Sequence, residues 1–66
     1  MKKKEQKALA QKIAKYELIV QTSDDKKRIR DAQDKIMELS GRVESLDDIA
    51  AIDEMVQEIL EKHLEK

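Results

Sequence analysis

The stretch that decides the fold is Ser45–Leu64, with the sequence SLDDIAAIDEMVQEILEKHL. Its apolar residues recur at intervals of three and four, which is the spacing of one face of an α-helix. They are Leu46, Ile49, Ile52, Val56, Ile59, Leu60 and Leu64. On a helical wheel this stripe is roughly 200° wide, whereas a helix that lies on one core shows a stripe of roughly 100°. We therefore expect this helix to contact more than one neighbour.

Polar residues mark the start of this helix and its outer face. Ser45 is the expected N-cap, and Asp48 is expected to complete an acidic form of the capping box. The face opposite the apolar stripe carries a ridge of carboxylates, namely Asp47, Glu54, Glu58, Glu61 and Glu65. This ridge is either a solvated surface or a surface that meets a basic partner.

Residues 3–21 are expected to form the first helix, with an apolar stripe of Leu9, Ile13, Tyr16 and Val20. A basic face lies broadly opposite this stripe and consists of Lys4, Lys7, Lys12 and Lys15. Leu18 and Ile19 lie outside the stripe, and Leu18 extends a line of small residues through Ala10 and Ala14. These two residues are either singly exposed, which is common, or form a second contact surface. That surface would meet another helix of the same chain or a partner.

The second helix is expected over residues 24–40, with Ser23 as its N-cap. Its stripe is Ile29, Ala32, Ile36 and Leu39, and Val43 continues the stripe into the following loop. Gly41 is expected to end the helix in the left-handed conformation that glycine adopts readily.

Three helices over residues 3–21, 24–40 and 46–64 predict a single all-α domain, residues 1–66, folded as an up-down-up three-helix bundle. The composition agrees, because the chain has no proline, one glycine and 44% charged residues. The alternative is a long helical hairpin that dimerises, which requires the second helix to continue through Gly41.

Charge is distributed unevenly along the chain. Residues 1–21 contain six lysines and two acidic residues, whereas residues 45–66 contain two lysines and seven acidic residues. In an up-down-up bundle the first and third helices are parallel neighbours, so the basic flank of one is expected beside the acidic ridge of the other.

No catalytic set can be assembled from the sequence. The only histidine, His63, has no serine or threonine within a helical turn, and its expected role is packing at the edge of the bundle. The chain has no cysteine. We therefore expect no enzyme activity, metal site, cofactor or small-molecule substrate.

The expected location is the cytoplasm, because the chain has neither a membrane-spanning apolar run nor a secretory signal pattern. A composition rich in Lys, Ile and Glu and without cysteine is typical of a small bacterial or phage cytosolic protein.

The predicted function is that of a small helical protein–protein interaction module, whose partner is another protein or a second copy in a homodimer. Its candidate surface consists of Leu18, Ile19, Asp53, Glu54, Glu58 and Glu61. Asp53 falls inside the wide apolar stripe, so it lies either at a solvated edge or in a specificity contact at a helix–helix or subunit interface. If it is buried, Arg28, Arg30 or Arg42 could pair with it. The alternative is a nucleic-acid-associated module that uses the lysines of the first helix. That helix lacks arginine for base contacts and aromatic residues interleaved for stacking.

Overall fold

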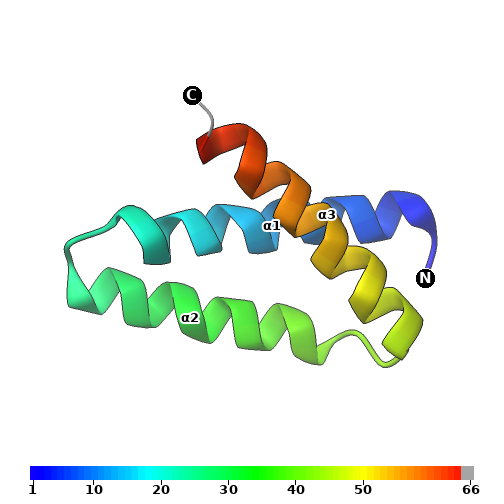
Figure 1. The fold of residues 1–66 in the computed structure, drawn as a ribbon. Helices are drawn as coiled ribbons and strands as arrows, with labels where there is room; N and C mark the ends of the chain where they lie inside the picture. Colours follow the sequence, from blue (N-terminus) through cyan, green and yellow to red (C-terminus); the bar gives the residue numbers. More distant parts are fainter. Residues whose placement is uncertain (65–66) are drawn as a thin grey trace.

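The computed structural model describes residues 1–64, which form three helices. They are α1 (Lys3–Thr22), α2 (Lys26–Gly41) and α3 (Leu46–Leu64). Figure 1 shows α1 and α2 as an antiparallel hairpin, with α3 crossing α1 obliquely and running broadly in the direction of α1. The chain is therefore the all-α, up-down-up three-helix bundle that the sequence predicts. The long hairpin is not formed, since α2 ends at Gly41.

α1 is the central helix of the bundle. It packs against both α2 and α3, whereas α2 and α3 barely contact each other. This position explains why α1 has apolar residues outside its main stripe. Leu18 lies beside Ile59 of α3, and Ile19 lies beside Ala32 of α2. Both residues are half-buried. Of the alternatives for Leu18 and Ile19, the structure thus shows the contact with other helices of the same chain.

The hydrophobic core lies along α1. The buried residues that form it are Ala10, Ile13, Ala14, Leu39, Val43, Ile52, Val56 and Leu60. Ala10 and Ala14 are the most completely buried residues of this cluster, with exposed fractions of 0% and 1%. Small side chains at these two positions permit the close approach of a neighbouring helix to the backbone of α1.

The turn between α1 and α2 differs from the prediction in its N-cap residue. The N-cap is Asp25, whose carboxylate accepts a hydrogen bond from the backbone N–H of Lys27 at 3.0 Å. Ser23, the predicted N-cap, instead follows α1 as its C-cap, and its hydroxyl accepts a bond from the N–H of Asp25 at 3.2 Å. α2 therefore begins two residues later than expected, because the longer turn lets Ser23 and Asp25 each bond a different backbone N–H.

Gly41 is the last residue of α2 and does not have a positive φ angle. The helix ends by tightening instead: the N–H of Arg42 bonds to the carbonyl of Leu39 at 3.3 Å, and the N–H of Val43 bonds to the carbonyl of Ser40 at 3.1 Å. Such bonds between residues three apart satisfy terminal carbonyls without a left-handed residue. The predicted left-handed conformation of Gly41 is therefore wrong.

The start of α3 is tied to the first turns of α1. Gln6 donates a hydrogen bond from Nε2 to Oδ1 of Asp48 at 2.6 Å, and the amino group of Met1 lies 3.5 Å from Oδ2 of the same carboxylate. Asp48 thus bonds α1, and not the backbone at Ser45 as a capping box requires. The carbonyl of Ser45 accepts the bond from the N–H of Ile49 at 3.0 Å, as expected of the residue before a helix.

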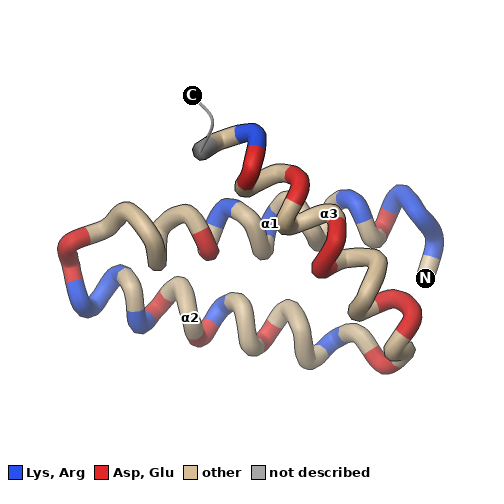
Figure 2. Tube along the Cα trace, in the orientation of Figure 1, with Lys and Arg blue, Asp and Glu red and all other residues tan. Residues whose placement is uncertain are grey.

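Figure 2 shows lysines gathered at the start of α1 and acidic residues spread along α3. The ion pairs between side chains within residues 1–64 are Lys35–Glu38 and Arg42–Glu38, at 3.5 and 3.4 Å, and both lie at the surface of α2 or just beyond its end. The expected pairing between the basic face of α1 and the acidic ridge of α3 is not formed within these residues. None of the three helices, as described, is both long and apolar enough to cross a membrane.

Candidate functional site

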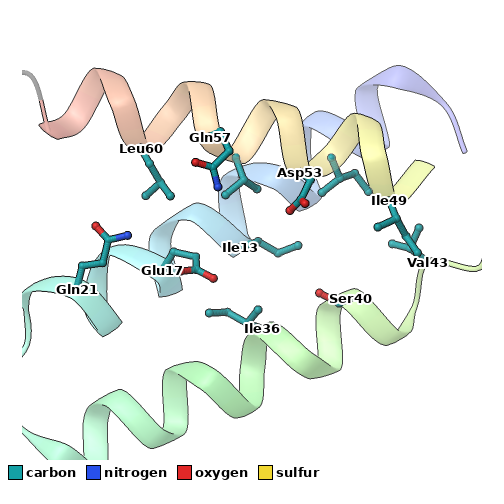
Figure 3. Close-up of a pocket in the computed structure, with 12 residues that line it drawn as sticks. Ile13, Glu17, Gln21, Ile36, Ser40, Val43, Ile49, Asp53, Gln57 and Leu60 are labelled. Carbon is teal, nitrogen blue, oxygen red and sulfur yellow. The ribbon is translucent and has the colours of Figure 1, made fainter. Parts of the chain in front are cut away.

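A groove lies between α2 and α3, where these two helices diverge over α1. Its cavity has a volume of ≈ 190 Å³. α1 forms the floor, and α2 and α3 form the two walls (Figure 3). The groove exists because both outer helices pack on α1 and barely contact each other, so no fourth element covers this part of α1 among residues 1–64.

Apolar side chains form most of the lining. They are Ile13 on the floor, Ile36 on the α2 wall, Val43 in the connecting loop, and Ile49, Ile52, Val56 and Leu60 on the α3 wall. Most of them are shared with the core, and Ile36 is half-buried. Ile49 is 42% exposed, although it belongs to the apolar stripe of α3. The groove is therefore the place where the core of the bundle reaches the surface.

Polar groups line the groove among these apolar residues. They are Glu17 and Gln21 on α1, Ser40 on α2, and Asp53 and Gln57 on α3. Figure 3 shows the carboxylates of Glu17 and Asp53 directed into the groove from two different helices, with the hydroxyl of Ser40 on the opposite wall from Asp53. No lysine or arginine is among the residues that line it. The set consists of two carboxylates, two amides and a hydroxyl among apolar side chains from all three helices, which suits binding of an amphipathic surface.

Asp53 is the one residue of the predicted interaction surface that lines this groove. It is exposed, and it has no ion pair with Arg28, Arg30 or Arg42 within residues 1–64. Within this chain Asp53 therefore lies at a solvated edge of the apolar stripe. This edge is the side of α3 that faces α2 across the groove.

The remaining acidic candidates lie outside the groove. Glu54, Glu58 and Glu61 are exposed on α3 and do not line the cavity. Glu65, the last residue predicted for the ridge, lies outside the described residues. The structure thus separates Asp53 from the acidic ridge, although the sequence analysis placed them on one surface.

The basic face of α1 is exposed, as its periodicity indicates. Lys4, Lys7, Lys12 and Lys15 are all exposed. Lys12 and Lys15 border a second, shallow concavity between α1 and α2, together with Lys35, Arg42 and Glu38 of the α2 segment. Glu38 is the acceptor in the ion pairs of both Lys35 and Arg42. His63 is exposed and lies over Leu18 and Ile59, at the edge of the α1–α3 contact.

Sequence reasoning missed Glu17 and Ser40 as residues of the site. Glu17 follows Ile13 by four positions and precedes Gln21 by four, so the three residues lie on one line of α1. Because the polar residues Glu17 and Gln21 continue the line of the buried Ile13, the sequence could have indicated that no other helix covers this line beyond Ile13. Ser40 offered no such signal, because it stands at the end of α2 where polar residues are common.

Comparisons with protein families, curated proteins and solved structures give no match for this chain. Within residues 1–64 no cluster of three or more potential metal-ligating side chains is present.

Proposed function

We propose that this protein is a small helical protein–protein interaction module that binds its partner along the groove between α2 and α3. The observation that supports this proposal is the groove itself, which has a floor and two walls but no cover, and which presents both apolar and polar side chains. Surfaces that bind other proteins combine apolar and polar groups in this way.

Exposed apolar residues extend the groove at its margins. Leu46 is 82% exposed and lies seven residues before Asp53, so the two share one side of α3. Ile49, which lines the groove on the α3 wall, is 42% exposed. A partner that fills the groove would cover Leu46 and Ile49 as well, which adds apolar area to the contact.

Binding of a helix is the mode that fits this geometry best. The walls and floor are helices, and their apolar residues recur at helical spacing, so a fourth helix can pack between them as in a helical bundle. The partner is either another protein or a second copy of this chain. We also propose that it is a cytosolic protein of a bacterium or phage, on the grounds of composition given above.

A tryptophan at Ser40 tests the proposal, because Ser40 is an exposed residue of the groove wall. We expect Ser40→Trp to fill the groove and to abolish the capture of proteins that crosslink to the wild-type chain. The matched control is Asp34→Trp, which places the same side chain on an exposed position of α2 outside the groove. Circular dichroism checks that both variants remain helical.

Two results would refute the proposal: a capture profile that Ser40→Trp leaves unchanged, or a profile that both tryptophan variants change equally. Sedimentation equilibrium of the same proteins measures their oligomeric state and so tests whether the partner is a second copy of the chain. A wild-type dimer that Ser40→Trp dissociates would assign the groove to self-association.

The nucleic-acid-associated alternative has one observation in its favour. Lys12 and Lys15 of α1 border the same concavity as Lys35 and Arg42, with one acidic residue among them. Backbone binding by such cations falls steeply with salt concentration. Retention on immobilised duplex DNA that is lost in Lys12→Gln/Lys15→Gln but kept in Lys4→Gln/Lys7→Gln would favour this function over groove binding.

A further inference from the structure

The groove carries negative charge that nothing in the described chain neutralises. The whole chain has 14 lysines and arginines against 15 acidic residues, so its charges are nearly balanced. The groove departs from this balance, because Glu17 and Asp53 line it and no lysine or arginine does. Within residues 1–64 neither carboxylate makes an ion pair or a side-chain hydrogen bond.

The position of Glu17 makes this charge informative. Glu17 is half-buried on the floor of the groove, one helical turn from the buried Ile13. An occupant that seals the groove would remove water from this carboxylate, and burying an unpaired charge is unfavourable. An occupant therefore gains most when it brings a cation to Glu17 and to Asp53.

The length of the groove sets the length of the occupant. Along α3 the lining runs from Ile49 to Leu60, which is about 17 Å at the helical rise of 1.5 Å per residue. The same distance corresponds to about three turns of a helix laid in the groove. Three turns supply three or four apolar residues on one face, with positions beside them for charged residues.

We propose that the occupant of the groove is a basic amphipathic helix of another protein, about three turns long, and this inference rests on the interaction function proposed above. Its apolar face packs on Ile13, Ile36 and Ile49. Lysines or arginines that flank this face pair with Glu17 on the floor and with Asp53 on the α3 wall. The pairing selects the partner by charge, while the apolar contact provides most of the binding free energy.

A second copy of the chain fits this groove less well than a basic helix does. The apolar lines of α1 are used within the bundle, and its exposed lysines have no exposed large apolar residues beside them within α1. α2 offers one exposed large apolar residue, Met37. α3 would bring the exposed carboxylates Glu54, Glu58 and Glu61 toward Glu17 and Asp53, and like charges at an interface are unfavourable.

The test uses two designed helical peptides with one shared apolar face of leucine and isoleucine. The flanking positions are lysine and arginine in the basic peptide and glutamate in the acidic peptide. Fluorescence anisotropy of the labelled peptides gives their dissociation constants for the full-length protein at low and at physiological salt. We expect the basic peptide to bind about tenfold more tightly at low salt, with a smaller ratio at physiological salt.

Charge-removing variants locate the source of this preference. Glu17→Gln/Asp53→Asn keeps the shapes of the side chains and is expected to abolish the difference between the two peptides. Glu54→Gln/Glu58→Gln removes the same charge from α3 outside the groove, and is expected to retain most of the difference. Thermal denaturation of both variants shows whether each one folds as the wild-type chain does.

The outcomes separate this inference from the proposed function. If both peptides bind equally well and Ser40→Trp abolishes the binding of both, the partner is not selected by basic charge. The proposed interaction function would still hold in that case. A preference for the basic peptide that Glu17→Gln/Asp53→Asn does not reduce would also overturn this inference, as would the failure of both peptides to bind. A self-associated wild-type chain that the basic peptide cannot dissociate would assign the groove to a second copy.

Discussion

Gln6 and Asp48, which are 42 positions apart in the sequence, are joined by a hydrogen bond of 2.6 Å from Nε2 to Oδ1. This bond fixes the start of α3 beside the first turns of α1, at the end of the bundle where α2 and α3 are connected. α3 diverges from α2 beyond this point, and the groove opens between them (Figure 1).

We expect this hydrogen bond to contribute measurably to stability, because its acceptor is a partly buried carboxylate. A double-mutant cycle of Gln6→Ala and Asp48→Ala isolates the pairwise interaction from other effects of each substitution. Urea denaturation should give a coupling free energy of about 1 kcal/mol, within the range for hydrogen bonds in proteins. A coupling indistinguishable from zero would show that the two side chains do not interact in solution.

The two isoleucines most prominent in the stripes of α2 and α3 should differ in their contribution to stability. Ile52 is 3% exposed, so Ile52→Ala is expected to cost about 2–5 kcal/mol of unfolding free energy. Ile36 lines the groove and is half-buried, so Ile36→Ala should cost about 1–2 kcal/mol. Thermal or urea denaturation measures both, and equal losses would place Ile36 inside a closed core.

Leu18→Glu should lower the stability of the fold itself. Leu18 packs against the core beside α3, so the substitution removes an apolar contact and brings a charge to the half-buried α1–α3 contact. A Leu18 that lay on a surface for a partner would give the opposite result, in which association weakens and the monomer stays intact. Met37→Glu is the control, since Met37 is exposed and its substitution should change the melting temperature little. An unchanged melting temperature for Leu18→Glu would show that Leu18 is exposed and does not pack against the core.

Gly41→Ala should stabilise the protein. Gly41 is helical without a positive φ angle, and a Cβ atom at this position would meet nothing within 4 Å. Alanine lowers the conformational entropy of the unfolded chain and is expected to add about 0.4–1 kcal/mol of stability. The measurement is the melting temperature, and a decrease would indicate the left-handed conformation that the sequence suggests for this glycine.

Much of the fold can be predicted from the sequence, because the periodicity of apolar residues indicates which face of a helix is buried. Ile52, Val56 and Leu60 are buried as the stripe of α3 predicts, and so are Leu39 in α2 and Val43 in the loop that follows it. Periodicity gives less weight to small residues, because they bury little apolar area. For this reason Ala10 and Ala14 were assigned to a secondary line of α1, although they are the most buried residues of the core.

The groove could not be predicted from the sequence, since helical periodicity fixes faces but not the angles between helices. The wide stripe of α3 indicated several neighbours, yet α3 packs mainly on α1, which leaves Ile49 and Leu46 exposed. Asp53 was identified as anomalous from its place in that stripe. Its relation to Glu17 of α1 depends on the oblique crossing of α3, which follows from side-chain packing between the helices.

The attachment of α3 to a single neighbour has a consequence for the opening of the native state. Detaching α3 breaks essentially one helix–helix interface, whereas displacing α1 breaks two. α3 should therefore open as a cooperative unit at a lower free energy than global unfolding, with the α1–α2 hairpin closed. In native-state hydrogen exchange, the amides of α3 would then exchange faster than those in the middle of α1. A helix bound in the groove would slow the exchange of the α3 amides, so that ligand binding and the local opening of α3 are thermodynamically linked.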